Sequence, residues 1–194
     1  MHYNINDSNA AIGWVLMRMG PDAVAQGEAR VPQADAPQPR PLTHAERRSL
    51  REDCGLSRRE AAEWHGVNER TVGYWEDGAG TPNEAADMDM MMLRLQLDAA
   101  AGQVVKTARA VIKAHPEIAG QPVELVRYKP HDYPRTQQAR EGLPHGAHNR
   151  LTNLSAEALA RDGIDSTIVY RGAGEWEATP PPEGFSGAAP DFMR

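Results

Sequence analysis

The stretch LSRREAAEWHGVNERTVGYWEDG, from Leu56 to Gly78, contains two short helical segments joined by only four residues, HGVN. A link this tight needs a residue that adopts a positive φ at no steric cost, and Gly66 supplies it. Two helices joined so closely cross at a steep angle with their backbones near each other. The crossing needs a small side chain, and Ala62 lies one helical turn before the glycine. The stretch therefore predicts two helices that pack at a steep crossing.

Helix start signals extend this pattern toward the N-terminus. Thr43 lies three residues before Glu46, and Ser57 lies three residues before Glu60. Both pairs have the spacing of a capping box, in which two side chains bond free backbone amides at the start of a helix. Asn68 is a third N-cap candidate. We therefore expect three short helices that start near residues 43, 57 and 68.

The last of these segments has an apolar side and a polar side. Val67, Val72 and Trp75 are expected to face inward and to form a motif core with Ala62 and Gly66. This arrangement is that of a helix-turn-helix, whose second helix lies in the DNA major groove. The outward side holds polar, forked or small residues, which are Asn68, Glu69, Arg70, Thr71, Gly73 and Tyr74.

Residues 42–82 resemble the Cro/Xre class of bacterial and phage regulators. The ending typical of that class, VxxRTVxYWExG…P, runs here from Val67 to Pro82. One position departs from the pattern, because His65 stands where the class usually has a large aliphatic residue. The resemblance implies a DNA-binding transcription regulator.

The helix-turn-helix geometry divides the candidate DNA contacts into two groups. Residues near the start of the second helix read bases, while arginines of the earlier helices contact phosphates, which set affinity and register. The expected base-reading residues are Asn68, Glu69, Arg70, Thr71 and Tyr74. The expected phosphate contacts are Arg47, Arg48, Ser57, Arg58 and Arg59.

The local charge balance leaves a second interpretation open. Residues 42–97 hold seven arginines against eleven acidic residues, whereas a DNA-binding domain usually has a basic face. A helical bundle used for protein contact is the alternative. The excess acid lies after Glu76, while six of the arginines fall in the first three helices. This distribution favours DNA binding.

Composition divides the whole chain into four parts. Residues 1–41 are expected to be a flexible arm and linker, since VPQADAPQPRP holds four prolines in eleven residues. Residues 42–115 are the expected DNA-binding domain with a long following helix, in which Met88, Met92, Leu95 and Ala99 recur at helical spacing. Residues 116–178 are the expected α/β dimerisation domain, and residues 179–194 a disordered tail.

The region after residue 122 changes to a strand–helix–strand pattern. VELVRY and STIVY are rich in β-forming residues. The segment between them places Ala147, Leu151, Leu154 and Ala158 on one helical face, and Gly163 suits a C-terminal cap. This order predicts a β-α-β unit with parallel strands. The expected fold class is a mainly α N-terminal helix-turn-helix domain followed by a small α/β dimerisation domain.

The same region resembles the C-terminal domain of the anti-CRISPR-associated repressors of the second type. The resemblance consists of ELVRY, a helix that contains HGAHNR, and then GIDSTIVY. In that family a similar helix-turn-helix domain precedes a small α/β domain. The resemblance implies repression of the protein's own operon by a homodimer on an inverted repeat, in phages and mobile elements.

Other kinds of site have little support. His145 and His148 form an HxxH pair, but a metal site needs further ligands, so a helix-cap or core role is favoured. The sequence contains no P-loop, GxGxxG or GxSxG motif. Cys54, the only cysteine, is expected to be a small buried hydrophobe. We therefore expect neither an enzyme, a cofactor nor a bound metal.

Charge and hydropathy indicate where the protein works. The net charge of −6 argues against loose coating of nucleic acid or of an anionic membrane. No apolar run approaches the ~20 residues needed to cross a bilayer, and the N-terminus lacks the order of a signal peptide. A cytoplasmic protein with no membrane contact is expected.

The sequence thus predicts a sequence-specific repressor that binds a double-stranded DNA operator as a homodimer. One alternative is an antitoxin-type autoregulator whose C-terminal half binds a partner protein. Another is an RNA-binding or protein-interaction module. The methionine run MDMMMLRL fits either the core or a dimer interface.

Overall fold

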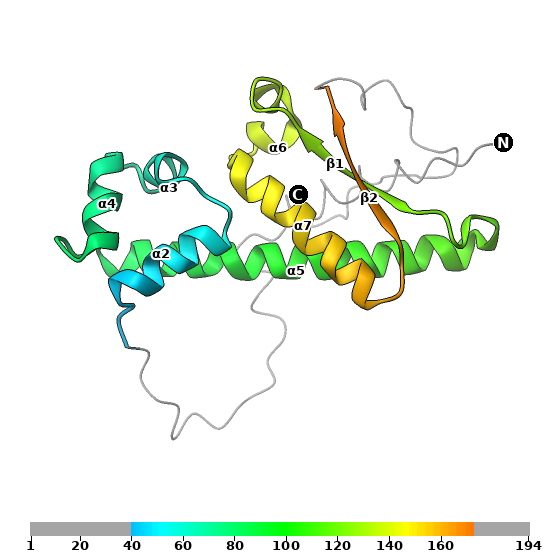
Figure 1. The fold of residues 1–194 in the computed structure, drawn as a ribbon, viewed down its shortest axis with the longest axis horizontal. Coiled ribbons are helices and arrows are strands. Elements are labelled where there is room, and N and C mark those ends of the chain that lie inside the picture. Colours follow the sequence, from blue (N-terminus) through cyan, green and yellow to red (C-terminus); the bar gives the residue numbers. More distant parts are fainter. Residues whose placement is uncertain (1–39, 173–194) are drawn as a thin grey trace, which may run out of the picture.

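The computed structural model describes residues 40–172, which are mainly helical and contain one small two-stranded parallel sheet (Figure 1). Six α-helices, α2 to α7, and two short 3-10 helices, η2 and η3, lie in this part of the chain. Most of the predicted N-terminal arm and all of the predicted tail at residues 179–194 lie outside the described residues.

Three short helices begin where the capping signals predicted them. These are α2 (His44–Asp53), α3 (Arg58–His65) and α4 (Glu69–Asp77). Thr43 and Ser57 each form a complete capping box with the glutamate three residues later. Asn68 caps α4 through its side chain. The predicted start of each helix is therefore confirmed.

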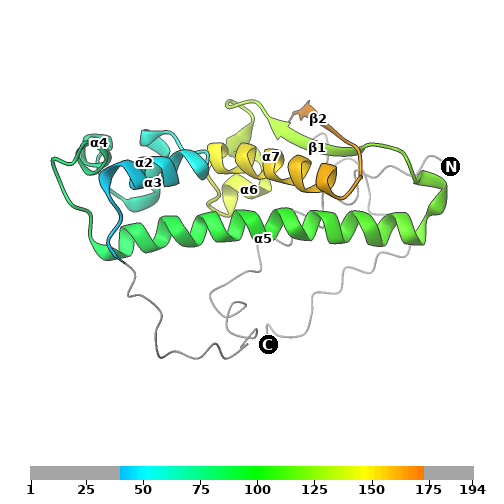
Figure 2. The same cartoon turned by 60° about the horizontal axis from the view of Figure 1, so that its bottom comes forward.

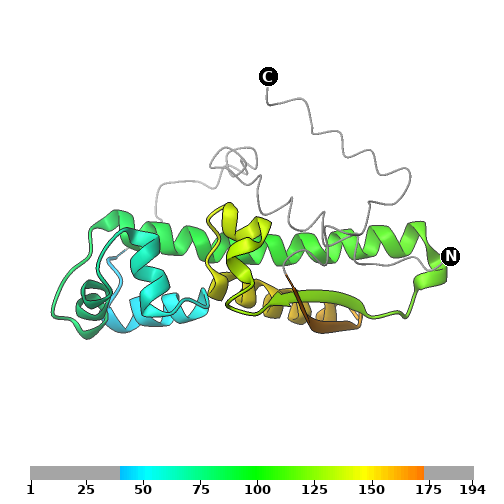
Figure 3. The same cartoon turned by 90° about the horizontal axis from the view of Figure 1, so that it is seen from above.

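A single long helix, α5 (Glu84–Ala114), runs along the whole described body. The three short helices lie near its N-terminal end, while the sheet and α7 lie along its later turns (Figures 1 and 3). In Figure 2 all the other described helices and both strands lie on one side of α5. The apolar side chains that α5 buries are Ala86, Met90, Leu93, Leu97, Ala100, Ala101, Val104 and Ala108.

The C-terminal part contains the predicted strand–helix–strand order. Strands β1 (Val123–Tyr128) and β2 (Ser166–Arg171) pair in parallel, with Val123 opposite Ser166 and Tyr128 opposite Arg171. The parallel pairing is confirmed. The connection contains α7 (His145–Arg161), which contacts both strands. The remaining short elements are η2 (Pro116–Ile118), η3 (Tyr133–Arg135) and α6 (Gln137–Arg140).

One hydrophobic cluster links the short helices to α7. It includes Cys54 and Leu56 next to α2 and α3, Leu97 of α5, and Leu151 and Leu154 of α7. A second cluster contains residues of α5, β1 and α7: Val104, Ala108, Val123, Leu125 and Leu159. Because α5 and α7 contribute to both clusters, they join the two ends of the described body.

Candidate nucleic-acid interface

The link between α3 and α4 is a tight turn closed by backbone hydrogen bonds. Gly66 lies in the left-handed region, with φ 64°, and its N–H donates to the carbonyls of Ala62 and Glu63. The N–H of Val67 also donates to the Ala62 carbonyl, at 2.9 Å. Asn68 then begins α4, because its side-chain oxygen accepts from the N–H of Arg70 at 2.8 Å. These bonds fix the direction of α4 relative to α3.

Small and apolar side chains pack beneath this turn. Ala62 and Val72 are buried at 4 % exposure each. Val67 and Trp75 are half-buried and pack against the same cluster. Four of the expected motif-core residues therefore pack beneath the turn, and the fifth, Gly66, forms the turn itself.

His65 occupies the position where the sequence departs from the Cro/Xre pattern. Its ring meets Trp75 edge-on, with the ring centroids 5.8 Å apart. Burial, opposed by Asp89 and Asp87, lowers the pKa of His65 below its ordinary value, which favours the neutral ring. A cavity of about 30 Å³ lies beside these two rings and Met90 of α5. An aromatic contact thus takes the place of an aliphatic one.

The outer side of α4 carries polar side chains at the surface. Asn68, Glu69 and Arg70 are exposed, Tyr74 is 41 % exposed, and Thr71 is half-buried. The guanidinium carbon of Arg70 lies 5.2 Å from the centre of the Tyr74 ring, within the range of a cation–π contact. Within residues 40–172, Arg70 forms no ion pair with an acid. Its forked donors are therefore held at the surface and remain open to an external acceptor.

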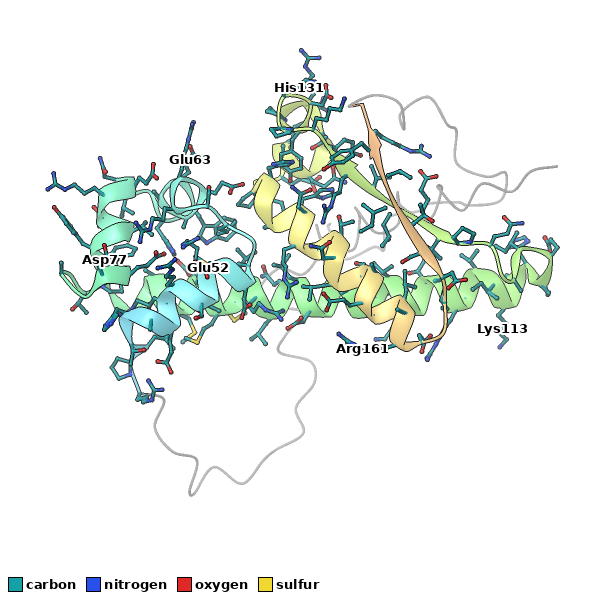
Figure 4. All side chains as sticks on the ribbon, in the orientation of Figure 1. Glu52, Glu63, Asp77, Lys113, His131 and Arg161 are labelled. Atoms are coloured by element: carbon teal, nitrogen blue, oxygen red, sulfur yellow. The ribbon has the colours of Figure 1, made fainter. Side chains whose placement is uncertain are left out.

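The residues expected to contact phosphate have different surroundings. Arg47 binds both carboxylate oxygens of Asp87 on α5, and both side chains are largely buried. Ser57 is occupied as the cap of α3. Arg48 and Arg59 are well exposed and pair with Glu52 and Glu63 one turn later. Figure 4 labels these two glutamates on α2 and α3.

Surface pairs at this spacing are worth only about 0.3–0.5 kcal/mol, so a phosphate can replace the carboxylate at small cost. The position of Arg47 differs, because binding a phosphate would require breaking a largely buried pair. Arg48 and Arg59 are therefore the best placed of the expected phosphate contacts.

A buried ion network beneath α4 was not predicted from the sequence. Glu76 of α4 accepts from Arg51 of α2 at 2.5 Å and from Arg58 of α3 at 2.9 Å. Arg51 also donates to the Leu56 carbonyl. Burial raises the pKa of Glu76, but the hydrogen bonds from both arginines outweigh it and leave that pKa below its ordinary value. One carboxylate thus ties α4 to the two preceding helices.

A second carboxylate joins α3 to α7. Glu60 completes the cap of α3 with Ser57, and its other oxygen accepts from the N–H of Gly146 at 2.7 Å. Gly55 and Gly146 meet backbone to backbone, since a Cβ on Gly146 would lie 2.1 Å from the Gly55 carbonyl oxygen. The orientation of the α3–α4 unit relative to α7 is therefore fixed by this joint.

The two histidines of the HxxH pair face the backbone of β1. His145 and His148 each place Nε2 within hydrogen-bond distance of a carbonyl, those of Tyr128 and Val126. Their rings pack with Tyr133. Across residues 40–172, no group of three or more His, Cys, Asp or Glu side chains is arranged to hold a metal ion. The pair anchors the start of α7 to the sheet.

Two further observations bear on function. Among the described helices, none combines the length and the apolar character that spanning a bilayer requires. No family model matches this chain, and a search of curated proteins finds no match.

Proposed function

We propose that the chain is a sequence-specific DNA-binding transcriptional repressor of the Cro/Xre type, with α4 as the helix that enters the major groove. The observation that carries this proposal is the exposed start of α4. There Arg70 lies over Tyr74, and no acid among the described residues neutralises it. An arginine at this end of a recognition helix can bind guanine O6 and N7 together.

The surroundings of α4 support the same assignment. The turn at Gly66 sets α4 steeply against α3, and the buried carboxylate of Glu76 holds α4 from below. Arg48 and Arg59 offer exposed cations on the two preceding helices. Base contacts from α4 and phosphate contacts from α2 and α3 are the division of roles expected of this motif.

The proposed mechanism is steric exclusion of RNA polymerase. One α4 helix reads too few base pairs for tight specific binding, so a homodimer on an inverted repeat is expected. A repeat near the protein's own gene, as the likeness to the anti-CRISPR-associated repressors suggests, would make it an autoregulator.

A second candidate function is favoured by one surface. Strand β2 exposes Ile168 and Tyr170, at 40 % and 62 %. Exposed apolar and aromatic side chains on a strand suit a protein partner. In an antitoxin-type regulator, this surface would bind the partner while α4 still reads the operator.

The test is selection of binding sites from a random duplex pool with the full chain. The proposal predicts enrichment of an inverted repeat whose half-site centres lie ~34–36 Å apart or a multiple of that. Arg70→Ala should enrich a motif that has lost preference at one base pair in each half-site. Failure of the folded wild-type chain to enrich any duplex motif would show that α4 does not read DNA.

A further inference from the structure

The side of α5 that faces away from the body carries a regular stripe. Its members follow at alternating spacings of four and three residues, which keeps them on one helical face. Met88 and Leu95 are 49 % and 61 % exposed, which is high for side chains of this size. The stripe, called here the α5 seam, consists of Met88, Met92, Leu95, Ala99, Gly102 and Lys106.

Five of the six residues of the α5 seam are exposed, and Met92 is half-buried. The buried side chains of α5 point to the opposite side, where every other described helix and strand lies (Figure 2). A row of large apolar side chains along an uncovered helix is typical of a protein interface.

The seam is complementary to itself when two copies run antiparallel about residue 97. In that register Leu95 lies opposite Ala99 of the second copy, and Met92 lies opposite Gly102 of the second copy. Met88 lies beside the aliphatic stem of the second copy's Lys106. Each large side chain thus meets a small or flexible one. A parallel pairing would instead place Met92 against Met92 and Lys106 against Lys106.

Gly102 gives independent support to this pairing. A glycine inside a helix costs roughly 0.5–1 kcal/mol relative to alanine. Nothing lies within 4 Å of a Cβ added at Gly102, so packing within the chain gives no reason for a glycine there. Close approach of a second helix supplies that reason, since a small residue lets a large side chain seat against the backbone.

Charge favours the same register. Asp89 and Lys106 are both exposed, and neither has an ion-pair partner among the described residues. The antiparallel pairing brings Asp89 next to Lys106 of the second copy, on both sides of the two-fold axis. Opposite charges at the borders of a helix pair set orientation.

We propose that the α5 seam is the interface of a homodimer, in which the α5 helices of two copies pack antiparallel. The inference deepens the proposed function and rests on it only for the operator geometry. It places the interface in α5 rather than in residues 116–178. The two-fold axis near residue 97 puts the first residues of the two α5 helices about 39 Å apart along the helix axis. This separation is of the order of one turn of DNA.

A cross-link tests both the partner and the register. The double variant Met92→Cys/Gly102→Cys should form intermolecular disulfides under mild oxidation, because the two positions meet only across the seam. Within one chain they lie about 15 Å apart, too far for a disulfide. Cys54 is fully buried and should give no background.

The single variants are the matched controls. Neither Met92→Cys nor Gly102→Cys should cross-link alone, because in the antiparallel register each lies far from its own equivalent. Cross-linking of Met92→Cys by itself would show a parallel pair and overturn the proposal. Absence of any cross-link in the double variant would overturn it as well.

Light scattering on the full chain gives a second readout. The wild type should have the mass of a dimer, and Leu95→Glu should halve that mass with unchanged circular dichroism. Ile168→Glu on β2 should leave the dimer intact. A wild-type monomer would overturn the proposal. A dimer disrupted by Ile168→Glu alone would place the interface at the sheet.

Neither experiment uses DNA. A chain that cross-links as predicted but enriches no duplex motif would keep the seam and lose the proposed function. A monomer that still enriches a motif would keep the proposed function and would overturn the α5 seam as a dimer interface.

Discussion

The outer faces of α4 and α5 differ in chemistry and in what holds them in place. The face of α4 is polar and carries Arg70 over Tyr74, whereas the face of α5 is apolar from Met88 to Ala99. Helix α4 has 9 residues and depends on the turn and the ion network beneath it, while α5 has 31 residues and a long buried side. A short helix such as α4 is held by its neighbours, so its position depends on residues far from its exposed side chains.

The largest expected effect comes from removing the anchor of α4. Glu76→Ala removes the nearest carboxylate of the buried Arg51 guanidinium and leaves only the 3.4 Å contact with the exposed Glu52, which should lower the free energy of unfolding by about 3–5 kcal/mol. Chemical denaturation measures this loss. Asp77→Ala is the matched control, because Asp77 is exposed and contacts Arg58 only at 3.5 Å. It should cost less than ~1 kcal/mol.

A substitution on the exposed face of α5 should affect stability far less than the loss of the α4 anchor. Leu95→Glu should change the free energy of unfolding of the monomer by no more than about 0.5 kcal/mol, because the side chain is exposed there.

For the ion network beneath α4, equal losses of unfolding free energy in Glu76→Ala and Asp77→Ala would show that Glu76 does not anchor the helix.

The next largest effect is a pH dependence that comes from the first turn of α7. Burial lowers the pKa of His148 to about 4, against an ordinary 6.5, and nearby His145 and Arg127 add to the shift while the bond to the Val126 carbonyl opposes it. The unfolded chain therefore binds more protons than the folded one between these values. Stability should fall by up to ~3 kcal/mol as the pH drops from about 6.5 to 4.

Denaturation curves across that pH range test this prediction. His148→Gln keeps a donor for the carbonyl of Val126 but does not titrate, so its stability should change less steeply with pH than that of the wild type. His131→Asn is the control, since His131 is exposed. If the stability of the wild type and that of His148→Gln change equally with pH, the buried imidazole of His148 is not the source of the pH dependence.

A smaller loss is expected at the joint between the α3–α4 unit and α7. A Cβ on residue 146 would meet the Gly55 carbonyl oxygen at 2.1 Å, so Gly146→Ala forces the two backbones apart. Overpacking of this kind typically costs about 1–3 kcal/mol. Gly73→Ala is the control, because the nearest atom to its added Cβ is 3.8 Å away. Equal unfolding free energies for Gly146→Ala and the wild type would show that the two backbones can move apart at no cost in stability.

The local features were predictable from the sequence because their causes are local. Thr43, Ser57 and Asn68 cap the three short helices as their spacing indicated. The parallel pairing of β1 and β2 followed from the strand–helix–strand order, since parallel strands need a crossover. Gly66 adopts the positive φ that a four-residue link requires.

The contacts between distant residues were not predictable in the same way. The pairs Arg47–Asp87 and Arg51–Glu76 join residues 40 and 25 positions apart, and no spacing rule signals them. The sequence showed an apolar stripe with Met88 and Leu95, but α5 carries a second one, and it is Met90, Leu93 and Leu97 that face the core. Which side of a helix with two apolar stripes becomes buried depends on the fold of the whole chain.

Whether α4 reads bases is decided by the effect of Arg70→Ala on the ratio of affinities for the selected operator and a scrambled duplex. Loss of a bidentate base contact should weaken operator binding by ~1–3 kcal/mol and scrambled binding much less. Arg59→Ala, which removes an exposed cation, should weaken both duplexes about equally and make the salt dependence shallower by about one unit per subunit. A ratio that falls in Arg70→Ala and holds in Arg59→Ala supports α4 as the base-reading helix. A ratio unchanged by Arg70→Ala would contradict that assignment.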